Sequence, residues 1–196
     1  MHSTFVFLLQ KGKIFQVEYA LKAVESAGLC LALKGRESIV LVTENRIQSK
    51  LLNKNPYSNF APDAPTISSI SEKVHKIDDH MFVASAGLAP DTETLIDRLR
   101  HYASQNYSQM GASINVSQAV RYMADIKQHL TQHGGSRPFG ASLVYFGVED
   151  EKLVLFSSNP TGNYEKYHAV AIGIFLDKAL ISEAYKIKDL IQIFLL

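Results

Sequence analysis

The sequence of 196 residues has one cysteine, almost no net charge and no long apolar run. The single Cys30 excludes an internal disulfide and a cysteine-based zinc cage, and it suits a reducing compartment. The net charge is +1 and the basic residues are scattered, so no basic surface predicts a nucleic-acid or acidic-membrane partner. No stretch approaches the roughly 18 apolar residues of a membrane-spanning helix. We therefore expect a soluble intracellular chain with neither nucleic acid nor membrane as a partner.

The first apolar run, residues 4–9, is followed by Lys11 and Lys13. A signal peptide has the opposite order, with positive charge before the apolar region and small residues after it. A short strand or an irregular start is the expectation here. The hydrophobic fraction of 46% and the length suit one globular domain over residues 1–196.

Apolar periodicity predicts alternating blocks of helices and strands. Residues 53–70 carry three prolines and predict a long loop. Strands in consecutive blocks favour an α+β domain over a β–α–β alternation. Helices are expected over residues 16–27, from Pro90, after a cap at Asn115, and from 175 to the C-terminus; strands are expected over 29–34, 38–43, 74–77, 81–86, 141–148, 153–158 and 164–171.

Residue patterns alone predict no metal site. His129 and His133 are four apart on a predicted helix, and His75 and His80 flank a turn, but no third ligand stands at a recognisable spacing. We expect all the histidines to be exposed to solvent, and no cofactor is implied.

The same patterns predict no nucleophile and no phosphate loop. The glycines of residues 134–140 follow a helix and precede a strand, which is the reverse of a phosphate loop. The G-x-S-x-G elbow is missing, and Cys30 lies in a predicted strand, where a buried and inert thiol is expected. Composition and spacing therefore lead only to an α+β domain.

Residues 12–20 read GKIFQVEYA and resemble the signature that opens the N-terminal helix of proteasome α-type subunits, with Lys13 and Ile14 as variants. Further segments match in the same order, at residues 71–74, 86–88, 125–128, 131–140 and 159–164. Among the members of this family, the eukaryotic type-4 subunit is the most similar over residues 27–31 and 125–140.

This resemblance implies the N-terminal-nucleophile hydrolase fold, a four-layer αββα sandwich of two antiparallel sheets. Catalytic members need an exposed N-terminal threonine, because its own amine activates its hydroxyl. Gly28 stands at that position, although Glu44 and Lys73 match the carboxylate and the lysine that accompany the threonine. The resemblance implies a non-catalytic subunit. A threonine-type peptidase is the alternative, and it would require processing that exposes a nucleophile at the start of the first strand.

The resemblance also implies interaction sites. Lys73 would line a pocket between subunits that receives the C-terminal carboxylate of an activator or regulatory particle; a solvated surface lysine is the alternative. The helix residues expected to contact a neighbouring subunit are Gln16, Val17, Glu18 and Tyr19.

The loop after the second long helix would line the annulus through which unfolded polypeptide passes. The implied partners are the other proteasome α and β subunits, and the implied setting is ubiquitin-dependent degradation in cytoplasm and nucleus. The annulus residues are His133, Gly134, Gly135, Ser136 and Arg137.

Three segments depart from the family pattern. Residues 1–11 lack its usual Tyr-Asp gate pair and Ser-Pro turn, and the loop at 53–70 is longer than the family's. Residues 175–196 read as a divergent helix where the family continues through further helices and two closing strands. A truncated product that does not assemble is therefore a further alternative, with a fold incomplete at its C-terminus.

Overall fold

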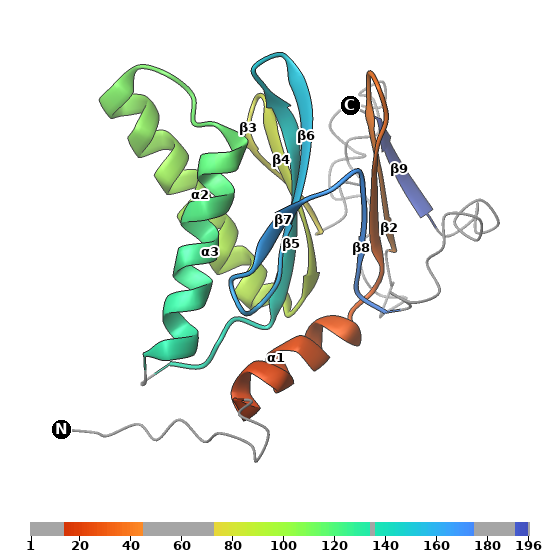
Figure 1. Cartoon of the computed structure of the whole chain (residues 1–196), viewed down its shortest axis with the longest axis vertical. Coiled ribbons are helices and arrows are strands. Elements are labelled where there is room, and N and C mark those ends of the chain that lie inside the picture. Colours follow the sequence, from red (N-terminus) through yellow and green to blue (C-terminus); the bar gives the residue numbers. More distant parts are fainter. Residues whose placement is uncertain (1–13, 45–72, 134–135, 175–190, 196) are drawn as a thin grey trace, which may run out of the picture.

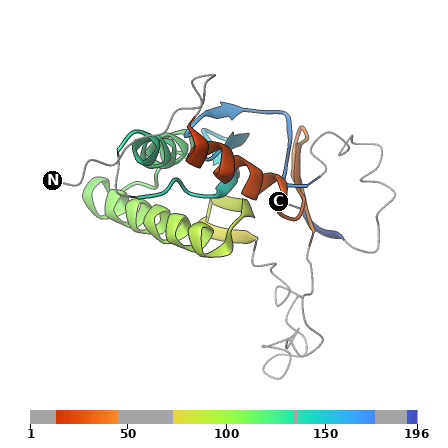
Figure 2. The ribbon, with the colours of Figure 1, turned by 90° about the horizontal axis from the view of Figure 1, so that it is seen from below.

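The computed structural model describes residues 14–44, 73–133, 136–174 and 191–195. The segment 1–11 and the loop expected over 53–70 lie outside the described residues. Two antiparallel sheets pack face to face, and α2 (Ala89–Met110) and α3 (Val116–Gln132) cover the outer face of one of them (Figure 1). The helix α1 (Phe15–Glu25) packs on β4 and β5 and lies across one end of this sandwich (Figure 2).

Both sheets are antiparallel throughout. The strand orders are β3-β4-β5-β6-β7 and β8-β1-β2-β9. This arrangement confirms the predicted α+β class and its two-sheet sandwich. The strands are β1 (Cys30–Lys34), β2 (Ile39–Glu44), β3 (Val74–Asp78), β4 (Met81–Gly87), β5 (Ala141–Glu149), β6 (Lys152–Ser158), β7 (Tyr164–Lys166), β8 (Ala169–Ile172) and β9 (Ile191–Leu195).

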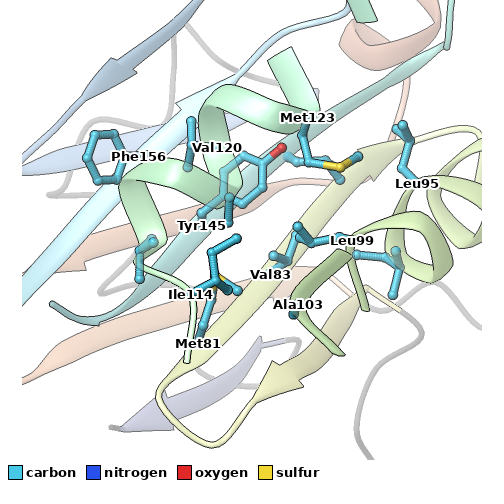
Figure 3. Packing of buried hydrophobic residues seen from close by; sticks show 14 of the residues in the cluster. Met81, Val83, Leu95, Leu99, Ala103, Ile114, Val120, Met123, Tyr145 and Phe156 are labelled. Atoms are coloured by element: carbon cyan, nitrogen blue, oxygen red, sulfur yellow. The ribbon is translucent and has the colours of Figure 1, made fainter. Parts of the chain in front are cut away.

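The central strand β5 contributes to two cores, because successive side chains on a strand point to opposite faces. Tyr145 packs against Leu99 and Met123 of the helices, in the core shown in Figure 3. Val144 and Phe146 face the other sheet. Coverage on both faces explains why β5 is apolar along nearly its whole length.

The single strand predicted over residues 164–171 is wrong. Two strands occupy this segment: β7 pairs with β6, whereas β8 pairs with β1 in the other sheet. The Tyr167 N–H donates to the Leu155 carbonyl at 2.9 Å, and the Lys34 N–H donates to the His168 carbonyl at 2.8 Å. The chain therefore passes from one sheet to the other between two neighbouring residues. The sequence does not reveal this step, because the residues on both sides favour extended backbone.

The helix predicted from residue 175 to the C-terminus is wrong over its last part. Ile191–Leu195 form β9, in which Ile193 pairs with Val42 of β2. Isoleucine and phenylalanine favour strands, so local propensity agrees with this outcome. Residues 175–190, the rest of this predicted helix, lie outside the described residues.

The three other predicted helices are present. Asn115 stands at the N-cap position of α3 as expected, but its side chain makes no capping hydrogen bond, and Glu149 of β5 fills that role. α2 has its proline in the first turn and is followed by Gly111, whose φ of 68° is the left-handed conformation typical of the residue that ends a helix. None of the helices in the described ranges is long and apolar enough to cross a membrane.

Candidate functional site

Gly28 is buried just before β1, where side chains from two other segments converge. Glu44 of β2 accepts a hydrogen bond from the Leu29 N–H at 3.1 Å, and the Glu44 N–H donates to the Leu29 carbonyl at 2.8 Å. Lys73 precedes β3, and its Nζ atom is buried. A Cβ atom on Gly28 would lie 3.1 Å from Glu44 Oε2 and would collide with Lys73 Nζ. The structure thus brings together Gly28, which the family resemblance placed at the nucleophile's position, and the two residues expected to accompany it, Glu44 and Lys73.

The Lys73 amine occupies the space in which a nucleophilic side chain would start. Gly28 has no hydroxyl, and its nitrogen is joined through Ala27 to the segment that follows α1. The backbone here is also held from the other side: the Ile174 N–H donates to the Ala27 carbonyl at 2.7 Å. Gly173, at φ 98°, approaches so closely that a Cβ would lie 2.6 Å from the Gly28 carbonyl oxygen. As it stands, the arrangement offers no hydroxyl paired with a free amine.

Cys30 lies close to this site and is fully buried. Burial raises the pKa of its thiol to about 12, although the positive charge of Lys73 opposes the rise. A thiol with this pKa is protonated at neutral pH and is a poor nucleophile. The predicted burial of Cys30 is confirmed, and the raised pKa agrees with the inert thiol that was expected.

The five residues assigned to the annulus loop are described only in part, since Gly134 and Gly135 lie outside the described residues. His133 is exposed, and its ring stacks on that of His129 at 3.8 Å between centroids. Ser136 is exposed as well. Both exposed side chains are available to solvent at the end of α3.

Arg137 differs from the rest of that loop because its guanidinium is held by Asp91. Two parallel hydrogen bonds of 2.6 and 2.7 Å join it to the two carboxylate oxygens, and the Gly140 N–H donates to the same carboxylate at 2.8 Å. Burial opposes ionisation of Asp91, but the bonds from Arg137 and Gly140 outweigh it and lower the pKa of the carboxyl. Arg137 thereby fixes the strand-side end of the loop to the first turn of α2.

The four α1 residues assigned to a subunit contact do not share one environment. Gln16 and Tyr19 are exposed, whereas Val17 and Glu18 are half-buried. Tyr19, 57% exposed, stands one turn from Phe15, 38% exposed, with their ring centroids 6.3 Å apart. We call these two side chains the α1 aromatic patch; exposed aromatic groups of this kind are enriched at protein interfaces.

A groove on the outer side of the helix pair was not predicted from the sequence. It has a volume of about 330 Å³ and lies between α2 and α3. Its lining is Arg98, Tyr122, Asp125, Ile126, His129 and Leu130.

The expectation that all histidines are exposed is wrong for two of them. His80 is half-buried, with Nε2 2.8 Å from the Ile114 carbonyl oxygen and Nδ1 3.5 Å from an Asp78 carboxylate oxygen. His75 has its Nε2 atom buried. Across the described part of the chain, no group of three histidine, cysteine or acidic side chains is arranged to hold a metal ion.

Lys127 was missed as a residue of interest. It is fully buried, and its amine contacts Ser158 of β6. The sequence contained an indication that Lys127 is buried, because it follows Val120 and Met123 at helical spacing on the apolar face of α3. A lysine on such a face is rarely buried without a polar partner.

The two-sheet sandwich, with helices on one outer face and the Gly28 site at the start of β1, is consistent with the fold of N-terminal-nucleophile hydrolases. A family model described as "Proteasome subunit" matches residues 24–189. The chain belongs to the proteasome subunit family.

Curated relatives agree with this assignment. The chain is 39% identical over 163 residues to "Proteasome subunit alpha" of Methanococcus maripaludis, a match that covers 83% of this chain and 58% of the relative. It is 37% identical to "Proteasome subunit alpha type-3" of Saccharomyces cerevisiae over 83% of the chain and 58% of the relative. It is 36% identical to "Proteasome subunit alpha" of Thermococcus sibiricus over 91% of the chain and 63% of the relative. The chain thus spans about three fifths of the length of these relatives.

Proposed function

We propose that the chain is a non-catalytic α-type subunit that contributes to the α ring of a 20S proteasome. The observation that carries the proposal is the Gly28 site, where Lys73 Nζ fills the nucleophile's space. The relatives named as α subunits support the same role. We also propose that the chain is most similar to the eukaryotic type-4 subunit and that it acts in cytoplasm and nucleus.

The chemistry of the fold supports the absence of catalysis. Peptide cleavage in this class needs a hydroxyl or thiol together with a free α-amine on the same residue. Gly28 supplies neither, and the neighbouring Cys30 is buried and protonated. Glu44 and Lys73 therefore act as structural groups that join the start of β1 to β2 and to the segment before β3.

A direct test separates this proposal from the peptidase alternative. The full chain, expressed with partner proteasome subunits, is treated with a peptide epoxyketone, which forms an adduct with an N-terminal threonine. We expect no adduct by intact mass and no cleavage after Ala27 by N-terminal sequencing. An adduct on this chain, or a mature N-terminus at the start of β1, would show that it is a peptidase.

Ring assembly is supported by the α1 aromatic patch. Phe15 and Tyr19 project from a helix whose opposite face, at Ala20 and Val24, is buried in the domain. Co-expression with other α subunits followed by native mass spectrometry tests the role, and we expect the chain in ring-sized complexes. Recovery solely as a free monomer would instead support the alternative of a product that does not assemble.

Activator docking and gating form the finer part of the proposal. The Lys73 amine is buried beside Gly28, so an incoming C-terminal carboxylate would contact it only after the side chain turns outward. In this proposal His133 and Ser136 line a passage for unfolded polypeptide; their exposure supports it, as does the pairing of Arg137 with Asp91, which anchors the loop. Binding of an activator C-terminal peptide to assembled rings, compared between wild type and Lys73→Ala, tests the docking role; equal affinity would exclude it.

A further inference from the structure

A buried polar cluster joins α3 to the end of the five-stranded sheet, away from the Gly28 site. It consists of Lys127, Ser158 and Tyr145, each at most 1% exposed, and we call it the Lys127 cluster. Lys127 Nζ lies 2.9 Å from Ser158 Oγ and 3.4 Å from the Ser158 carbonyl oxygen. The Tyr145 hydroxyl lies 3.1 Å from the same Ser158 Oγ. Figure 3 shows Tyr145 extending from β5 towards Met123 of α3.

The hydrogen bonds of this cluster depend on the protonation of one amine. An ammonium group has three N–H donors and no acceptor, whereas a neutral amine has two donors and a lone pair. With a neutral Lys127, the Tyr145 hydroxyl donates to Ser158 Oγ, and the Ser158 hydroxyl donates to Lys127 Nζ. With a charged Lys127, the ammonium donates to Ser158 Oγ and to the Ser158 carbonyl oxygen, so its charge is met only by the neutral acceptors of Ser158.

No described acidic side chain belongs to this cluster. Tyr145 is the titratable group that β5 contributes, and its buried hydroxyl has a raised pKa, so it remains neutral. From β7, the Lys166 amine lies 5.6 Å from the Phe156 ring. On the outer side of α3, Asp125 and His129 line the groove together with Arg98 of α2. Burial lowers the pKa of Lys127 to about 7, so both forms are populated near neutral pH.

The cluster lies where α3 is in direct contact with the turn after β6. Gly162, at φ 89°, packs against α3 so closely that a Cβ would lie 2.7 Å from the Ala124 carbonyl oxygen and 2.7 Å from Gln128 Cβ. Because the Lys127 side chain is fully buried, hydration of its charged form requires α3 to separate from this turn. The segment that would move leads directly to His133 at the end of the helix.

We propose that the Lys127 cluster is a protonation-dependent latch, which holds the C-terminal half of α3 on β6 when the amine is neutral and releases it when the amine is charged. The latch goes beyond the proposed ring role and does not rest on it. Its acceptors all come from within one domain, so it operates in the free chain as well as in a complex.

The latch is tested by amide hydrogen exchange of the full-length chain between pH 6 and pH 9, corrected for the intrinsic exchange rate. Local opening that exposes Lys127 returns its pKa towards 10.5, so exchange over residues 124–132 and 156–163 should slow by about tenfold per pH unit from pH 7 to pH 9. In Lys127→Met this pH dependence should vanish, whereas Lys166→Met should retain it. Equal pH dependence in Lys127→Met and wild type, or none in wild type, would overturn the latch.

A second measurement does not require the variant to fold. In the wild-type chain labelled with ¹³C at lysine Cε, one resonance should titrate with a midpoint about three pH units below the others, as the lowered pKa predicts. Titration of every lysine near its ordinary value would equally overturn the latch.

Discussion

Glu149 caps α3 from a different element of the fold: its carboxylate accepts a hydrogen bond from the Ser117 N–H at 3.2 Å and another from the Ser117 hydroxyl at 2.5 Å. A carboxylate at this end also interacts favourably with the helix dipole. The start of α3 is thereby tied to the far end of β5.

Replacing Glu149 with alanine should lower the free energy of unfolding by about 1 kcal/mol, because a helix cap is lost. Urea unfolding monitored by circular dichroism measures the change. The same substitution at the exposed Glu25 of α1 is the matched control and should stay within about 0.5 kcal/mol of wild type. Equal effects at the two positions would show that the cap does not stabilise the fold.

The Asp91–Arg137 pair predicts a loss of stability in acid. The folded state lowers the pKa of Asp91, so the pair stabilises the fold above the ordinary carboxyl pKa near 4, and this contribution is lost as the pH falls through the lowered folded pKa. Asp91→Asn should cost about 1–3 kcal/mol at pH 7 and should flatten the acid limb of the stability curve. Urea midpoints between pH 3 and pH 7 test this; an unchanged acid limb would contradict it.

Gly28 and Lys73 should be coupled. Gly28→Ala places a methyl group against the end of the Lys73 side chain and 3.1 Å from Glu44 Oε2, and should destabilise the fold by up to about 1 kcal/mol, because the flexible lysine end must shift. In a Lys73→Ala background the same change should be nearly neutral, because the space is free. A double-mutant cycle from urea unfolding measures the coupling, and additive effects would mean that the two groups do not compete for one space.

Lys127 predicts a stability that rises with pH on the alkaline side. Its folded pKa of about 7 lies below the ordinary 10.5, so the unfolded chain binds the extra proton between these values and stability grows as the pH increases. From pH 7 to pH 9 the gain should approach about 2.7 kcal/mol, and below pH 7 it should level off. Lys127→Met should be flat over this range in urea unfolding, and a parallel rise in the variant would point to other groups.

Tyr19 should matter for association more than for folding. Tyr19→Ser removes an exposed ring, so the free energy of unfolding should change by less than about 0.5 kcal/mol. Incorporation into ring-sized complexes should fall severalfold by native mass spectrometry. Tyr164→Ser, at an exposed tyrosine on β7, is the control and should assemble normally; equal loss in both variants would remove the case for the α1 aromatic patch.

The local sequence pattern was sufficient to predict most of the helices and strands, because each has a clear apolar periodicity or a residue that marks its boundary. The turn between β5 and β6 is an example: Asp150 and Glu151, with φ of 50° and 59°, lie in the gap between the strands predicted over residues 141–148 and 153–158. The sheet change at Tyr167 and His168 could not be predicted, because pairing partners come from distant segments. The strand β9 was missed since a short apolar run suits a helix or a strand equally well.

The candidate site was predictable as far as residue identity, but not in its geometry. Alignment with the family placed Glu44 and Lys73 beside Gly28, and the structure brings them together. The sequence could not predict that the Lys73 amine lies in the space that a side chain at position 28 would enter, because this depends on the three-dimensional arrangement. The burial of Lys127 was not predicted either, because a charged residue is normally expected at the surface. Its position on the apolar face of α3 becomes clear only when the helical spacing to Val120 and Met123 is considered.

The sheet change between Tyr167 and His168 has a mechanical consequence. Since one residue bonds to β6 and the next residue bonds the chain to β1, the two sheets cannot slide past each other without breaking hydrogen bonds in at least one of them. A pulling force applied to either sheet is therefore carried covalently into the other.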